Sequence, residues 1–185
     1  VGSEMCIRDS ICTDSVSVNL FKVLAVALSL SARPGKILSE ADNFPSDLYL
    51  VEGMKTLLGA AAPAFEVVQT DALLEHLDAS VTILLLTQVN FKTGAMHDLT
   101  GLTARAQAVG ALVIWDLSHS TGVLDLDVDA ANVDFAVGCG YKFLNGGPGA
   151  PGYLYVASRH QGSVTQPLSG WMGHAEPFAF SQDYE

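Results

Sequence analysis

The segment Val81 to Leu86, VTILLL, constrains the fold of this chain most strongly, because it is a nearly continuous apolar run too short for a typical helix. A strand of this composition is expected to be buried on both faces, as strands of parallel sheets are. Similar runs follow at Ala111 to Trp115, Val133 to Gly138 and Gly152 to Ala157. The sequence therefore predicts a sheet whose strands are covered on both sides.

Helical segments are predicted between these strands. Residues Asn19 to Ser31 place Leu20, Val23 and Leu24 on one face of a helix. Further helices are predicted at Asp47 to Ala60, Asp71 to Leu77 and His97 to Val109, and shorter strands at Lys36 to Ser39 and Phe65 to Gln69. Strands that alternate with helices predict an α/β domain with a mainly parallel sheet flanked by helices. Such sheets bind ligands beyond the carboxyl ends of their strands.

Charge and composition exclude several kinds of partner. The net charge is −11 and no basic stripe offsets it, so we expect neither nucleic acid nor a membrane as a partner. The longest apolar run, Val18 to Leu30, contains Asn19 and Lys22 and is too short and too polar to span a bilayer. The three cysteines lack a disulfide-framework spacing, which favours a cytoplasmic location. Histidines, cysteines and carboxylates show no metal-ligand spacing, so no metal is expected.

The two ends of the chain differ from its middle. Val1 to Ser10 has neither helical nor strand periodicity, so residues 1–12 are expected to be a non-native or disordered leader. Residues 13–185 are expected to form part of one domain. The absence of an initial methionine and of a natural ending predicts that this domain is incomplete at both ends.

Polar side chains follow the predicted strands at their carboxyl ends. Thr87 ends VTILLL, Asp116 ends ALVIW, and His119 follows three residues later. Lys142 follows VDFAVG after a short loop and precedes a glycine-rich stretch. An aspartate and a lysine at two strand ends suit pyridoxal phosphate, since the amine bonds to the aldehyde and the carboxylate pairs with the pyridinium nitrogen. Taken singly, the same residues are ordinary: Asp116 as a turn or cap residue, Lys142 as a surface lysine and His119 as a core or turn histidine.

Four segments together carry a more specific resemblance. They are DNFPSDLYL, WDLSHSTG, DFAVGCGYKFLNGGPGAPGYLYV and QPLSGWMGH. From about Thr13 onward the chain resembles kynureninase, a pyridoxal-phosphate hydrolase of the aspartate-aminotransferase-like superfamily. The resemblance implies the large cofactor-binding domain of fold type I and pyridoxal 5'-phosphate as cofactor. It also implies a homodimer that hydrolyses L-kynurenine or 3-hydroxy-L-kynurenine to anthranilate or 3-hydroxyanthranilate and L-alanine, in tryptophan catabolism and NAD biosynthesis.

The resemblance assigns three catalytic residues. Lys142 resembles the Schiff-base lysine, and Asp116 resembles the partner of the pyridinium nitrogen. Tyr141 resembles a tyrosine that reaches the phosphate and is a candidate acid in the mechanism. His119 resembles the histidine beside the ring.

Further cofactor contacts are implied by the same resemblance. Phe44 resembles the aromatic residue that stacks on the ring, and the FPSD motif that it begins ends at Asp47, which is expected near the ring. Thr87 matches a small hydroxyl residue near the cofactor, and Trp171 resembles a tryptophan that contacts the phosphate across the dimer interface. The predicted cofactor-binding residues are Val16, Ser17, Phe44, Pro45, Ser46, Asp47, Thr87, Asp116, His119, Tyr141, Lys142 and Trp171.

Val16 and Ser17 occupy the turn that binds phosphate in the family. They open a predicted helix, where free backbone N–H groups and the helix dipole favour an anion. Ser17 as a plain N-cap is the alternative, and the two interpretations are compatible because both use the same geometry.

Two alternatives for the function stay open. Other enzymes of the superfamily, cysteine desulfurase-like or aminotransferase-like, share the Asp, His and Lys pattern, although FPSD and SGWMGH favour kynureninase. The chain is otherwise an inactive fragment that binds the cofactor or a partner subunit. Arg33, Arg105 and Arg159 do not match the arginine that binds the substrate carboxylate in the family.

Overall fold

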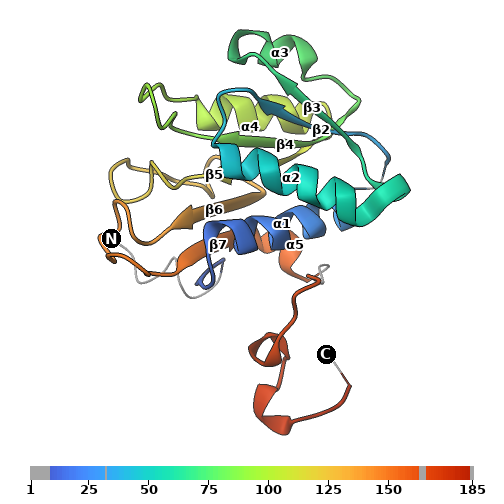
Figure 1. Cartoon of the computed structure of the whole chain (residues 1–185), viewed down its shortest axis with the longest axis vertical. Coiled ribbons are helices and arrows are strands. Elements are labelled where there is room, and N and C mark those ends of the chain that lie inside the picture. The colour runs from blue at the N-terminus through green and yellow to red at the C-terminus, as the bar shows by residue number, and fades with distance from the viewer. Residues whose placement is uncertain (1–8, 32, 163–165, 184–185) are drawn as a thin grey trace.

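The computed structural model describes residues 9–31, 33–162 and 166–183. Seven strands form one mixed sheet in the order β1-β7-β6-β5-β4-β2-β3 (Figure 1). Strands β3, β2, β4, β5 and β6 run parallel, whereas β7 is antiparallel to β6 and β1 is antiparallel to β7. The predicted mainly parallel α/β sheet is therefore confirmed. The strands are β1 (Ser10–Cys12), β2 (Lys36–Glu40), β3 (Ala64–Val68), β4 (Val81–Thr87), β5 (Leu112–Asp116), β6 (Phe135–Cys139) and β7 (Gly152–Val156).

Helices cover both faces of this sheet. The α-helices are α1 (Val16–Leu30), α2 (Pro45–Leu58), α3 (Leu73–His76), α4 (Leu99–Ala108) and α5 (Ser158–Gln161). Short 3-10 turns are η1 (Gly59–Ala61), η2 (Thr70–Ala72), η3 (Trp171–Gly173) and η4 (Pro177–Ala179). Helices α1 and α2 pack together on one face, and α4 lies on the other (Figure 1).

Strand β4 shows how the sequence produces these layers. All its residues are buried, and successive side chains point to opposite faces. Ile83 and Leu85 join the core beneath α1 and α2, whereas Leu84 and Leu86 join the core that includes Trp115 and faces α4. A strand with a core on each side needs apolar residues at nearly every position, which is why VTILLL shows no alternation.

The predicted leader, residues 1–12, extends three residues too far, because residues 10–12 belong to the sheet. Ser10–Cys12 forms β1, which pairs with β7 from Ser10 opposite Tyr155 to Cys12 opposite Tyr153. Three residues at a sheet edge carry no period that could be recognised, and their conformation depends on backbone pairing with a strand far along the chain. Residues 1–8 of the predicted leader lie outside the described residues.

The C-terminal segment, residues 166–183, extends away from the sheet (Figure 1). It contains η3 and η4, and Trp171, Phe178 and Phe180 are exposed in it. Within the described part of the chain, no helix is long and apolar enough to cross a membrane.

Candidate active site

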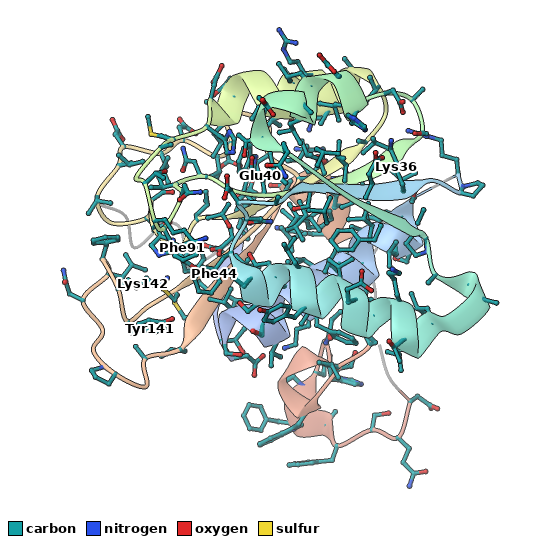
Figure 2. The ribbon with its side chains drawn as sticks, turned by 45° about the horizontal axis from the view of Figure 1, so that its top comes forward. Lys36, Glu40, Phe44, Phe91, Tyr141 and Lys142 are labelled. Carbon is teal, nitrogen blue, oxygen red and sulfur yellow. The ribbon has the colours of Figure 1, made fainter. Side chains whose placement is uncertain are left out.

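A cavity of about 160 Å³ lies at the carboxyl ends of β5 and β6. Its wall joins segments far apart in the sequence: the start of α1, the turn between β2 and α2, and the loops that follow β5 and β6. Phe44, Tyr141 and Lys142 gather at this end of the molecule (Figure 2). The lining residues are Ser15, Val16, Ser17, Phe44, Ser46, Asp116, Ser118, Cys139, Tyr141, Lys142, Ala150 and Gly152. The structure thus brings together most of the residues that the sequence predicts for the site.

Two carboxyl groups meet on the buried side of the cavity. Asp116 ends β5, and its Oδ1 accepts a hydrogen bond from the Ser118 amide at 2.7 Å. Asp47 lies in the first turn of α2, and Asp47 and Asp116 are each only 1% exposed. Burial, reinforced by the neighbouring Asp116, raises the pKa of Asp47 to about 8. Asp47 therefore holds a proton at neutral pH, and its buried Oδ2 has no hydrogen-bond partner among the described residues.

Lys142 and His119 meet beside these carboxyl groups. The Nζ of Lys142 lies 2.9 Å from the Nε2 of His119 and 5.3 Å from the centre of the Phe44 ring. Burial and the positive charge of Lys142 lower the pKa of His119, so the imidazole is neutral at pH 7. A neutral imidazole that accepts a hydrogen bond at Nε2 carries its proton at Nδ1. That Nδ1 is buried without a partner among the described residues, so it can donate to a ligand.

The FPSD motif spans the start of α2. Phe44 is the N-cap residue, and Pro45 takes the first helical position, where its missing N–H costs nothing. The Phe44 ring packs edge-on against Phe91 at 5.0 Å and lies 6.1 Å from the His119 ring. Phe44 and Ser46 line the cavity, whereas Pro45 does not. The motif thus supplies the aromatic wall and places Asp47 behind it.

The first turn of α1 forms another part of the wall. Ser15 caps the helix, and its side chain accepts a hydrogen bond from the Val18 amide at 3.4 Å. The alternative in which Ser17 is the N-cap is therefore wrong, because the chain enters the helix two residues earlier. Val16 and Ser17 lie within the first turn and face the cavity. Free N–H groups of a first helical turn suit an anion such as a phosphate.

Of the twelve predicted residues, five are not among those that line the cavity: Pro45, Asp47, Thr87, His119 and Trp171. Thr87 ends β4, and its hydroxyl donates a hydrogen bond to the Oδ1 of Asn43. Trp171 lies in η3, is 56% exposed, and contacts Phe178 and Phe180 of its own segment. The structure of one chain therefore leaves Trp171 away from the cavity.

Sequence reasoning missed three residues that shape the site. Ser118 lies two positions after Asp116, which is the spacing of an Asx turn and could have been recognised. Ser15 could have been found as a cap residue before an apolar helix. Asn43 offered no signal, because the contact that ties it to the strand end at Thr87 joins residues 44 positions apart.

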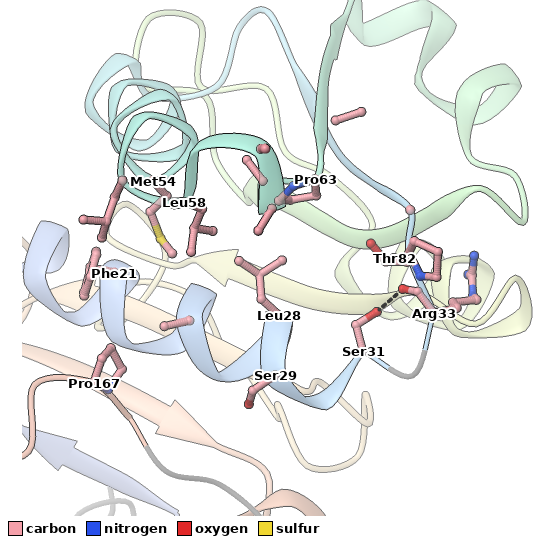
Figure 3. Close-up of a pocket in the computed structure, with 18 residues that line it drawn as sticks. Phe21, Leu28, Ser29, Ser31, Arg33, Met54, Leu58, Pro63, Thr82 and Pro167 are labelled. Atoms are coloured by element: carbon pink, nitrogen blue, oxygen red, sulfur yellow. Dashed lines mark hydrogen bonds between the residues drawn. The ribbon is translucent and has the colours of Figure 1, made fainter.

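A larger groove of about 850 Å³ lies at the opposite ends of the strands, between α1, α2 and η1 (Figure 3). Its walls are mostly apolar, with Phe21, Leu28 and Met54 among them. Among the described residues, Arg33 is the one charged residue of this lining, and it donates hydrogen bonds to the carbonyls of Ala79, Val81 and Val109. Because backbone carbonyls engage that guanidinium, the described lining residues offer no group for acid–base chemistry.

The fold and this site define the class of protein. Residues 24–176 match the family model for aminotransferase class-V, and the chain belongs to this family. Within it, the chain is 51% identical to a kynureninase from Deinococcus radiodurans over 175 residues, covering 92% of this chain and 41% of the relative. It is 44% identical to a kynureninase from Pseudomonas fluorescens, covering 94% of this chain and 42% of the relative. The chain thus spans about two fifths of the length of these relatives.

Solved structures show the same fold. An apo cysteine desulfurase from Thermococcus onnurineus superposes with a TM-score of 0.75 at 23% identity, covering 88% of this chain and 42% of that chain. The cystine C-S lyase C-DES in complex with cysteine persulfide superposes with a TM-score of 0.71 at 22% identity, covering 88% of this chain and 45% of that chain. The predicted fold class is confirmed by these likenesses.

Proposed function

We propose that this chain forms a pyridoxal-phosphate site, and that the protein to which it belongs hydrolyses L-kynurenine to anthranilate and L-alanine. The observation that carries the proposal is the meeting of Lys142, His119 and Asp116 at neighbouring strand ends, in a chain 51% identical to a kynureninase. The acceptance of 3-hydroxy-L-kynurenine is proposed on the same resemblance.

The chemistry of the residues present fits this cofactor. Lys142 offers an amine for an aldehyde, and Asp116 offers a buried carboxylate for a ring nitrogen. The first turn of α1 offers N–H groups for a phosphate. The buried His119 Nδ1 has no partner among the residues that the structure describes, which is expected of a group that waits for a ligand.

Each residue then has a defined task in the reaction. When bound, pyridoxal phosphate supplies an electron-withdrawing ring that stabilises negative charge on the substrate carbons. Asp116 keeps the ring nitrogen protonated. The Nζ of Lys142 holds the cofactor and is placed to move a proton at the substrate α-carbon, while neutral His119 orients it by accepting its hydrogen bond.

Tyr141 is the proposed acid. A tyrosine hydroxyl keeps its proton at neutral pH, and partial burial, with a smaller effect of Cys139, raises the pKa of Tyr141 further, so it can donate that proton to the carbon released by bond cleavage. The overall reaction consumes one water: the Cβ–Cγ bond breaks, the acyl carbon takes the hydroxyl group and the alanine carbon takes a proton.

We also propose a cytoplasmic homodimer, in which the sheet domain described above, including β1, is part of the large domain. The support is the cluster of exposed aromatic residues at Trp171, Phe178 and Phe180, since contiguous exposed apolar surface marks association sites. In this proposal Trp171 contacts the phosphate bound by the partner chain.

The test uses the protein at the full length encoded by its gene, with the Lys142→Ala variant as a control. Incubation with pyridoxal phosphate and L-kynurenine is expected to release fluorescent anthranilate and an equal amount of L-alanine, and the variant is expected to release neither. 3-Hydroxy-L-kynurenine and L-cysteine are offered in parallel. Release of alanine from L-cysteine, without anthranilate from kynurenine, would contradict the proposal in favour of a desulfurase-like activity.

A further inference from the structure

We propose that Asn43 is a positioning residue, which fixes Phe44 beside Lys142 and His119 through a buried hydrogen-bond network with Ser39 and Thr87. The inference concerns the same site and rests on the proposed function for its link to the cofactor. Its geometric part concerns this chain alone and can be tested without any ligand.

Asn43 is the centre of the network. It is 2% exposed, and its Nδ2 donates a hydrogen bond to the Ser39 Oγ at 2.9 Å. Its Oδ1 accepts from the Phe44 amide at 2.8 Å and from the Thr87 hydroxyl. Ser39 in turn donates to the Leu85 carbonyl at 2.7 Å. One amide side chain thus joins the ends of β2 and β4 to the start of α2.

The network acts on the part of the chain that carries the aromatic wall. Strand β2 ends at Glu40 and α2 begins at Pro45, so residues 41–44 cross from the sheet to the helix. Thr87 lies opposite Asp116 in the register of β4 and β5. The Thr87 hydroxyl therefore ties the Phe44 backbone, through Asn43, to the end of β4, which pairs with the end of β5 that carries Asp116.

The same arrangement assigns Thr87 an indirect effect on the cofactor. Its hydroxyl is engaged with Asn43, and Thr87 does not belong to the cavity wall. The Phe44 ring, by contrast, lies on that wall, 5.3 Å from the Lys142 Nζ and 6.1 Å from the His119 ring. A buried polar network whose members are all hydrogen-bonded specifies one geometry, because any displacement leaves a buried group unpaired.

The binding test is a double-variant cycle on Asn43→Ala and Thr87→Val, read as the Kd for pyridoxal phosphate. Each single variant is expected to raise the Kd about tenfold, because a tenfold change corresponds to about the free energy that one buried hydrogen bond contributes. The double variant is expected to bind no more weakly than Asn43→Ala alone, and Thr87→Ser is expected to bind like the parent. Additive losses would overturn the proposal, since they would mean that Thr87 contacts the cofactor independently.

Thr82→Val is the matched control. Thr82 lies on the same strand and is 3% exposed, and its hydroxyl donates to the Lys36 carbonyl at 3.2 Å, at the end remote from the cavity. It is expected to lower the unfolding midpoint in urea about as much as Thr87→Val does, with no change in Kd. Equal losses of affinity in Thr82→Val and Thr87→Val would reduce the role of Thr87 to general stability and overturn the proposal.

A second readout separates this inference from the proposed function. In the cofactor-free chain, the NMR resonances of the His119 ring protons report on the nearby Phe44 ring. We expect them to move in Asn43→Ala and in Thr87→Val, and to keep their parent positions in Thr82→Val and Thr87→Ser. Unmoved resonances in Asn43→Ala would contradict the positioning role. If the parent chain binds no cofactor, the proposed function fails while the NMR comparison still decides this inference.

Discussion

The two sides of the cavity are built differently. Its inner wall, defined as Asp116 in the cavity lining together with Asn43, Asp47 and Thr87, which lie outside the lining, is 1–3% exposed. Its outer wall, defined as Tyr141 in the lining together with Phe143 and Leu144 of the same loop, is 44–51% exposed. The ends of β4 and β5, the segment after β2 and the start of α2 hold the inner wall, whereas the loop between β6 and β7 carries the outer one. The comparison teaches that this chain alone preorganises the buried side of the cavity, which in the proposed function faces a ring nitrogen, and leaves the other side exposed.

The largest difference is expected between one substitution on the inner wall and one on the outer wall, measured as affinity for the cofactor. Asp116→Asn keeps the shape and removes the charge that we propose pairs with the ring nitrogen, so we expect a loss of at least about 3 kcal/mol, or more than about 100-fold in affinity for pyridoxal phosphate. Tyr141→Phe on the exposed wall is expected to change that affinity by less than about threefold. Titration of the absorption change measures both. Similar losses in the two variants would mean that the walls do not differ in this way.

The pH dependence of folding stability tests whether Asp47 of the inner wall is protonated in the folded chain. The pKa of Asp47 is about 8 in the folded chain and near 3.8 when the chain is unfolded, so between those values the folded chain binds more protons. Stability therefore falls as pH rises through this window, by on the order of 4 kcal/mol between pH 5 and pH 8. Urea unfolding of the cofactor-free chain measures the slope. Asp47→Asn is expected to flatten it, and an unchanged slope would place the titrating group elsewhere.

Alanine substitutions at two glycines, one in the sheet and one in the C-terminal segment, are expected to differ in their effect on the free energy of unfolding. A Cβ at Gly138 in β6 would lie 2.3 Å from the Tyr153 hydroxyl oxygen, and that hydroxyl is held by Thr121. Gly138→Ala is expected to cost roughly 1–2 kcal/mol of unfolding free energy, because the buried ring cannot move away. Gly170→Ala meets no atom within 4 Å and is expected to be neutral. Equal unfolding midpoints in urea for the two variants would show that the Tyr153 ring moves aside without loss of stability, which would contradict the prediction.

The smallest effect is expected in the exposed aromatic cluster. Trp171→Ala removes a side chain whose ring contacts are Phe178 and Phe180 of its own segment, so the free energy of unfolding of the single chain should change by less than about 0.5 kcal/mol. Urea unfolding at low protein concentration provides the measurement. A loss well above 1 kcal/mol would mean that this segment stabilises the sheet domain itself.

The same contrast explains what the sequence could predict. The apolar run VTILLL is enough to predict β4 and its burial, and the positions of Asp116 and Lys142 after strands are enough to predict that they meet. Strand β1 could not be predicted, because three edge residues fold by pairing with β7. The role of Thr87 was also out of reach, since it depends on Asn43, which lies 44 positions away in the sequence. Local pattern predicts the elements, whereas contacts between distant residues decide the details of the inner wall.

The central claim is that Lys142 is the residue to which pyridoxal phosphate becomes attached. The most direct measurement adds the cofactor to the folded chain, records the near-visible absorption, reduces the product with borohydride and maps the labelled peptide. The account predicts a new absorption band, label on the peptide that contains Lys142, and loss of both in Lys142→Ala. Label distributed over other lysines, or no band in a chain shown to be folded, would contradict it.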